Sequence, residues 1–207
     1  MSLLTPWGYT LTDTDVLPDV LSVNDFNAYT AGKFSGDARI LSEISAASQA
    51  VRNFCGWHVY PSEGCKMQTT FYDRRVTQTG SDILIQLPAR FVSAVSSVKI
   101  GSTSVSTFIL ETNGLLWIYG VGCGYAKYTP IEIVYMAGLP ESMAGALTEV
   151  VANRVTHALA QSYGVQSESA GGVSVTYSAN WMNSASGSAL PDNNKEVLTP
   201  YRLQGVF

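Results

Sequence analysis

Three residues whose side chains could bind a metal ion, Cys55, His58 and Cys65, lie close together in the sequence. Zinc sites use such thiolate and imidazole ligands, usually as closely spaced pairs that repeat further along the chain. The spacing here matches no standard zinc motif, and a fourth ligand is not evident. Cys55 also falls on the apolar face of a predicted helix, where a free cysteine behaves as a small hydrophobic residue. We therefore predict no metal and no cofactor.

Nucleophilic catalysis would need a thiol or hydroxyl beside a histidine that a carboxylate orients. Cys123 with His157 is the pair that could do this, and a thiol hydrolase is therefore the enzymatic alternative. The sequence contains no G-x-S-x-G, H-E-x-x-H or paired acidic motif. A strand-like segment follows the glycine-rich stretch Gly120–Gly124, so we expect a hairpin turn there rather than a phosphate-binding loop. The sequence predicts that the protein is not an enzyme.

Charged residues make up only 14% of the 207 residues, and the net charge is −4. Because a quarter is usual, this composition indicates a surface covered by other proteins or a monomer rich in Ser, Thr and Asn. The negative charge argues against a surface that grips phosphate backbone, although DNA can still pass nearby.

The cysteine content and the hydropathy of the chain indicate in which cellular compartment the protein is expected. The three cysteines favour free thiols in a reducing compartment over a disulfide framework. No secretory signal opens the chain, and the longest apolar run, Leu115–Ala126, is too short to span a bilayer. We expect a soluble protein with no membrane partner.

The most strongly patterned stretch, Gly36–Val59, predicts an amphipathic helix of about five turns. Asp37 at its start and Arg52 in its last turn suit the helix dipole, and Gly56 ends it. A second helix is predicted over Glu141–Tyr163, and each helix needs a partner for its apolar face. We expect the two to pack together. The apolar stripe of the first helix consists of Ile40, Ile44, Ala47, Val51 and Phe54.

Between these helices the hydrophobic pattern changes to period two, which is typical of strands. Asn113-Gly114 between two apolar runs is the strongest hairpin signal. A short helix capped by Ser22 precedes the first long helix, and a strand-like alternation recurs at Val173, Val175 and Tyr177. The predicted fold is α+β: a helical bundle of two main amphipathic helices plus short helices, with an inserted antiparallel β domain and extended termini. The predicted parts are an N-terminal arm (1–21), a helical core (22–57 and 138–164), the β domain (58–137) and a C-terminal arm (165–207).

The chain ends in an apolar segment after a stretch rich in Ser, Gly and Asn. A polar tether that ends in an apolar anchor favours docking onto another subunit. The alternative is a tail that folds back onto its own helices. The predicted interface with a partner or a neighbouring subunit consists of Val197, Leu198, Tyr201, Arg202, Leu203, Val206 and Phe207.

Several landmarks, in their order and separation, resemble the head-tail connector (adaptor) proteins of long-tailed bacteriophages, the group often called gp6-like or gp15-like. Phe54-Cys55-Gly56 matches the aromatic-Cys-Gly end of that group's first helix. Tyr135–Pro140 matches the Tyr-x-x-Gly-x-Pro segment that leads into the second helix. Leu198–Arg202 matches the closing L-x-P-Y-R segment. The resemblance covers most of residues 20–207, and the large β insertion departs from the smaller all-helical members.

The resemblance implies a structural virion protein of the phage neck that is assembled in the host cytoplasm. Copies would form a ring, twelvefold in this family, that binds the portal protein and receives the stopper or tail-completion protein. DNA would pass through the channel without sequence-specific binding. The alternative is a carbohydrate- or receptor-binding β module of a virion, with Trp117, Tyr119 and Tyr125 as stacking platforms.

Overall fold

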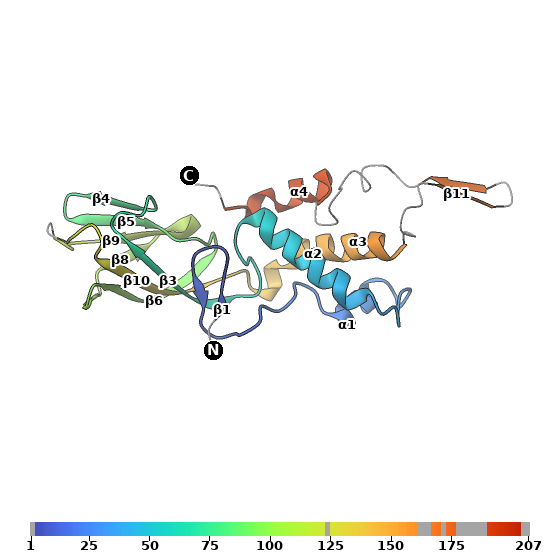
Figure 1. The fold of residues 1–207 in the computed structure, drawn as a ribbon, viewed down its shortest axis with the longest axis horizontal. Coiled ribbons are helices and arrows are strands. Elements are labelled where there is room, and N and C mark those ends of the chain that lie inside the picture. The colour runs from blue at the N-terminus through green and yellow to red at the C-terminus, as the bar shows by residue number, and fades with distance from the viewer. Residues whose placement is uncertain (1–2, 123–124, 161–166, 171–172, 177–189, 204–207) are drawn as a thin grey trace. The chain divides into compact units, whose positions relative to one another are not determined.

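A computed structural model describes residues 3–122, 125–160, 167–170, 173–176 and 190–203, and the fold is given for these residues (Figure 1). The chain divides into two compact units. The strand unit comprises Met1–Pro18, Cys55–Ala144 and Tyr201–Phe207, and the helix unit comprises Asp19–Phe54 and Gly145–Pro200. The chain therefore passes from one unit to the other at four points.

Two antiparallel sheets build the strand unit. The larger has the order β1-β2-β3-β10-β6-β7, and the smaller has the order β4-β5-β9-β8. The larger sheet consists of β1 (Leu3–Leu4), β2 (Thr10–Leu11), β3 (Glu63–Thr70), β10 (Pro130–Ala137), β6 (Val92–Ile100) and β7 (Thr103–Val105). The smaller sheet consists of β4 (Val76–Thr79), β5 (Asp82–Gln86), β9 (Leu115–Ile118) and β8 (Phe108–Leu110).

The core of the strand unit follows from the period of two along each strand. In β5 and β9 the residues Ile83, Ile85, Leu116 and Ile118 are fully buried, whereas their neighbours Leu84 and Trp117 are half-buried on the other face. Strand β10 alternates in the same way with Ile131, Ile133 and Tyr135 buried. The central strands of each sheet thus bury one of their two faces.

The turn at Asn113-Gly114 confirms the hairpin prediction. Strands β8 and β9 pair antiparallel, and the short 3₁₀ helix Thr112–Gly114 connects them. Asn113 and Gly114 have positive φ angles of 63° and 75°. A Cβ atom on Gly114 would lie 2.2 Å from the carbonyl oxygen of Ala89, so only glycine fits at this close approach.

The helix unit contains α1 (Val23–Tyr29), α2 (Ile40–Cys55), α3 (Gly145–Ala160) and α4 (Asp192–Leu198). The Ser22 hydroxyl accepts a hydrogen bond from the Asp25 amide at 3.1 Å, which confirms the predicted cap of α1. In α2 the predicted stripe is buried at Ile40, Ile44, Ala47 and Val51 and half-buried at Phe54. A separate antiparallel hairpin consists of β11 (Ser167–Ala170) and β12 (Val173–Thr176). Strand β12 contains Val173 and Val175 of the predicted alternation, and Tyr177 lies outside the described residues.

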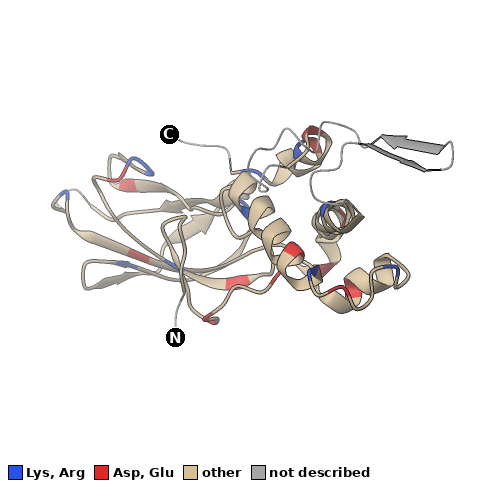
Figure 2. Cartoon of the chain, turned by 45° about the vertical axis from the view of Figure 1, so that its right-hand side comes forward, with Lys and Arg blue, Asp and Glu red and all other residues tan. Residues whose placement is uncertain are grey.

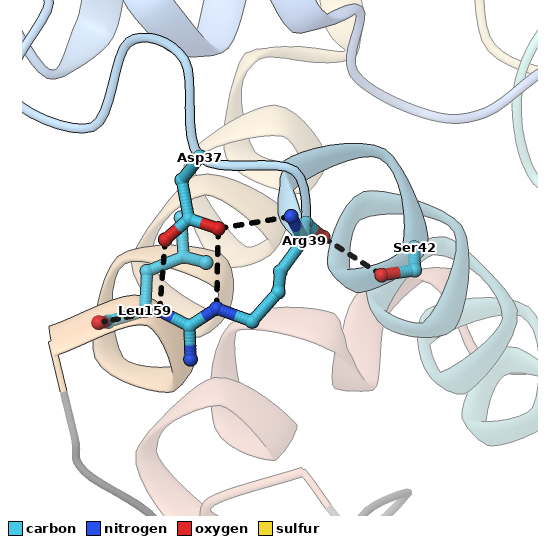
Figure 3. Close-up of polar contacts among 4 residues, drawn as sticks. All are labelled: Asp37, Arg39, Ser42 and Leu159. Atoms are coloured by element: carbon cyan, nitrogen blue, oxygen red, sulfur yellow. Dashed lines mark hydrogen bonds and ion pairs between the residues drawn. The ribbon is translucent and has the colours of Figure 1, made fainter.

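The start of α2 is joined to the end of α3 by Arg39 (Figure 3). Its guanidinium donates to both carboxylate oxygens of Asp37, at 3.1 and 2.8 Å, and to the carbonyl oxygen of Leu159 at 3.4 Å. These hydrogen bonds from Arg39 lower the pKa of Asp37. Asp37 also accepts from the Arg39 amide at 2.9 Å, so this carboxylate fixes the chain just before α2 begins.

The predicted fold class is wrong. The described residues are mostly antiparallel β-sheet, with ten strands in the two sheets of the strand unit, two more in the β11–β12 hairpin and four α-helices of 7–16 residues, and not a helical bundle with an inserted β domain. Both long helices begin later than their patterns indicated: α2 begins at Ile40 rather than at Asp37, although it ends before Gly56 as predicted, and α3 begins at Gly145 rather than at Glu141. The predicted end of the second helix, residues 161–163, lies outside the described residues. Residues expected to form an arm contribute β1 and β2, because their backbone pairs with β3 although their side chains show no sustained period.

Candidate functional site

The predicted interface residues of the C-terminal segment differ in exposure. Leu198, the last residue of α4, is fully buried, whereas its neighbour Val197 is 46% exposed. Tyr201 and Leu203 are half-buried, and Arg202 is exposed. The remaining two residues of the prediction, Val206 and Phe207, lie outside the described residues.

Three hydrogen bonds hold residues 201–203 within the strand unit. The indole N–H of Trp57 donates to the carbonyl oxygen of Tyr201 at 2.8 Å, and the amide of Leu203 donates to the carbonyl oxygen of Cys55 at 2.8 Å. The guanidinium of Arg90 donates to the carbonyl oxygen of Arg202 at 3.2 Å. Every one of these bonds uses the backbone of residues 201–203.

Aromatic rings support the same segment. Trp57, which is fully buried, stacks on Phe91 with ring centroids 6.1 Å apart and an interplanar angle of 22°. Phe91 in turn contacts the ring of Tyr201 at 6.1 Å. Burying these rings removes a large apolar area from water, and the pairs add specific ring contacts. Tyr201 is therefore fixed by both its backbone and its ring.

The residues tested for metal binding have other roles. A carbonyl oxygen can only accept, so His58 donates from Nε2 to the carbonyl oxygen of Ala137 at 2.8 Å and accepts at Nδ1 from the Tyr9 hydroxyl at 2.7 Å. Burial raises the pKa of both Cys55 and Cys65 to about 12, so each remains a thiol at neutral pH. In the described part of the chain, no group of three His, Cys, Asp or Glu side chains could hold a metal ion.

The catalytic alternative rested on two residues. His157 is exposed on α3, and Cys123 lies outside the described residues. The arrangement required for a thiol nucleophile is therefore not part of the described geometry.

The three proposed stacking platforms separate into two places. Trp117 in β9 and Tyr119 just after that strand lie next to each other, with ring centroids 6.2 Å apart and planes within 12° of parallel. Tyr125 instead stacks on Phe71 at 5.7 Å, close to a further pair formed by Tyr72 and Tyr128 at 6.0 Å. The sequence analysis missed this second cluster. No local sequence pattern indicates this cluster, because it forms only where the end of β3 pairs with the start of β10.

A comparison with protein families gives one finding. The sequence model of a family described as head completion protein matches residues 19–203. No curated protein matches the chain. In the ranges that the structure describes, no helix combines the length and the apolar character needed to cross a membrane.

Proposed function

Because this chain belongs to the head completion protein family, we propose that it is a head-tail connector (adaptor) that forms a ring between the portal and the stopper or tail. Family membership makes it a structural head or neck protein of a bacteriophage virion, which acts through contacts with other head or tail proteins. The finer proposal places it in the gp6-like or gp15-like group, with twelve copies in the ring and assembly in the host cytoplasm.

The observation that carries the proposal is the way the C-terminal segment is held. Three backbone hydrogen bonds and the Trp57–Phe91–Tyr201 ring contacts fix residues 201–203 in the strand unit. The four residues that follow in the sequence end in Val206 and Phe207. A short segment that follows a fixed point loses less conformational entropy on docking than one at the end of a flexible tether.

We assign the seven predicted interface residues to two roles: holding the C-terminal segment on its own chain, and contacting a partner. Leu198, Tyr201 and Leu203 hold the segment on its own chain. Val197, Arg202, Val206 and Phe207 make the contact with the portal or with the neighbouring subunit.

The charge distribution supports a channel wall that DNA passes without being held. Figure 2 shows charged residues of both signs distributed over the described chain. The net charge of −4 opposes a lasting grip on phosphates, since such binding draws on clustered Lys and Arg.

Electron microscopy of the protein mixed with its purified portal ring tests the connector role. We expect annular particles that carry an added layer on the portal. A Val206→Asp/Phe207→Asp variant should lose this layer, whereas a Glu111→Gln variant, changed at an exposed position of the strand unit, should keep it. Folded wild-type protein that leaves the portal ring bare would overturn the proposal.

A second candidate function is a carbohydrate- or receptor-binding β module. It is favoured by the nearly parallel rings of Trp117 and Tyr119, both half-buried, because stacked aromatic side chains can present a ring face to a sugar. A glycan array should then give hits that Trp117→Ala abolishes and Tyr125→Ala, at the other aromatic cluster, leaves intact. An array without hits would remove this candidate.

A further inference from the structure

Two aromatic pairs lie where β3 ends and β10 begins. Phe71 stacks on Tyr125 within 12° of parallel, and Tyr72 contacts Tyr128. The side chains of Tyr72 and Tyr128 are 70% and 75% exposed. We call residues 71–75 and 125–130 the aromatic end of the strand unit. Its two segments are held together because Thr70 and Pro130 are partners in the β3–β10 register.

The aromatic end is also positively charged. Its charged residues are one acid, Asp73, and three bases, Arg74, Arg75 and Lys127, which give a formal charge of +2 in a chain of net charge −4. Arg75 pairs with Asp73, with Nη2 2.7 Å from a carboxylate oxygen. Tyrosine and arginine are enriched in protein–protein contacts, and the positive charge of this end selects an acidic partner surface.

The opposite end of β3 has the complementary character. Residues 12–18 together with Glu63 contain three acids, Asp13, Asp15 and Glu63, and no base. Burial, and next the charge of Asp13, raise the pKa of Glu63. We call these residues the acidic end of the strand unit.

Local hydrogen bonds shape the acidic end. The Asp13 carboxylate accepts from the Gly64 amide at 3.1 Å, and the Thr14 hydroxyl accepts from the Val16 amide at 3.2 Å. This turn leaves Asp15 exposed and Val16 76% exposed. An apolar side chain beside carboxylates is what the exposed tyrosines and cations of the aromatic end would contact.

The two ends cannot meet within one molecule. Strand β3 has eight residues and joins them directly, which places them about 25 Å apart. Opposite charge at opposite ends of one rigid strand is the arrangement that a head-to-tail contact between copies requires. Such heterologous contacts generate closed rings when the rotation between neighbours closes.

We propose that the aromatic end of one copy docks on the acidic end of the next copy, with Tyr72 and Tyr128 against Val16 and the basic side chains facing Asp15. This inference rests on the proposed function, because it supplies the contact between neighbouring copies of the ring. It assigns a role to exposed aromatic residues outside the C-terminal segment.

A disulfide experiment tests the contact directly. In a Cys123→Ser background, Val16→Cys and Tyr128→Cys are introduced together, and the protein is oxidised both on the portal ring and alone at high concentration. Head-to-tail contact gives a ladder of covalent multimers. Each single-cysteine variant gives no ladder, whereas a mixture of the two single variants gives heterodimers. Melting curves equal to that of the parent confirm that these exposed positions tolerate the change.

Reversing the charge of the aromatic end provides a second test of the contact. Adding Arg74→Asp/Lys127→Asp to the double-cysteine variant should lower the ladder yield about tenfold or more, since like charges then face each other. Rings on the portal without a ladder would overturn the docking inference and leave the connector proposal standing. A portal ring that carries no added layer of this protein would overturn the connector proposal itself. Duplex DNA bound by the wild type and lost in Arg74→Asp/Lys127→Asp, with no ladder, would show that this end binds nucleic acid, which also overturns the inference.

Discussion

The indole N–H of Trp57 and the carbonyl oxygen of Tyr201 form a 2.8 Å hydrogen bond although 144 residues separate them in sequence. Trp57 directly follows the glycine that ends α2, and Tyr201 is the residue at which the chain enters the strand unit for the last time. This bond therefore ties the predicted partner-binding tail to the interior of the strand unit. Several consequences can be measured.

Trp57→Phe should lower the free energy of unfolding by about 1–3 kcal/mol. The phenylalanine keeps a ring against Phe91, but it has no indole N–H. The carbonyl oxygen of Tyr201 therefore loses its hydrogen bond from residue 57. Chemical denaturation measures the change. Trp117→Phe, at a half-buried position on β9, serves as the control and should cost less. If Trp57→Phe and Trp117→Phe lower the free energy of unfolding equally, the hydrogen bond from Trp57 to Tyr201 contributes little to stability.

Val51→Asp should unfold the protein or cost about 3 kcal/mol or more. Val51 is fully buried in the stripe of α2, where a carboxylate would have neither water nor a partner. The matched control is Leu41→Asp on the same helix, because that side chain is 63% exposed. Circular dichroism melting curves distinguish the two variants. A cooperatively melting Val51→Asp variant with near-normal stability would contradict the burial of this stripe.

The acid sensitivity of the protein should depend on Asp73. Hydrogen bonds from Arg75, the largest effect, hold the pKa of Asp73 well below its ordinary value. A lowered folded-state pKa gives stability that is complete above the unfolded-state pKa, near 4, and is lost as the pH falls toward the folded-state value. Asp73→Asn should therefore cost about 0.5–1 kcal/mol between pH 5 and 7, since the pair is partly exposed.

Below pH 4 the difference between wild type and Asp73→Asn should shrink. Denaturation at a series of pH values checks this, with Glu111→Gln as a carboxylate control at an exposed position. If the difference in free energy of unfolding between wild type and Asp73→Asn stays constant down to pH 2, the Asp73–Arg75 ion pair is not its source.

Two truncations should separate docking from folding. Deleting residues 204–207 preserves every described contact of the tail, so we expect an unchanged melting temperature and loss of portal binding. Deleting Lys195–Phe207 also removes the buried Leu198 and the Tyr201 contacts. Loss of one buried leucine typically costs about 2–5 kcal/mol, so this variant should melt much lower. Portal binding by the shorter deletion would place the contact in residues 197–203 instead.

Local patterns predicted the elements of this fold better than its architecture. The Ser22 cap, the α2 stripe and the Asn113-Gly114 turn each depend on neighbouring residues, and the structure contains all three. The pairing of Thr10 with Lys66 depends on residues distant in sequence, and no periodicity of Leu3–Leu11 indicates it. The sheets consequently organise more of the chain than the two long helices suggested.

The candidate site was predicted in part for the same reason. The apolar character of Leu198–Leu203 is visible in the sequence, whereas the bond from Trp57 is not. The pairing of Tyr72 with Tyr128 likewise arises only when β3 and β10 lie side by side.

The chain passes between its two units after Pro18, Phe54, Ala144 and Pro200. Neither unit is a contiguous stretch of the gene, so recombination at a single junction cannot exchange one while keeping the other. For the same reason, one protease cut releases neither unit intact. Exchange of either unit between related chains therefore needs several junctions at once.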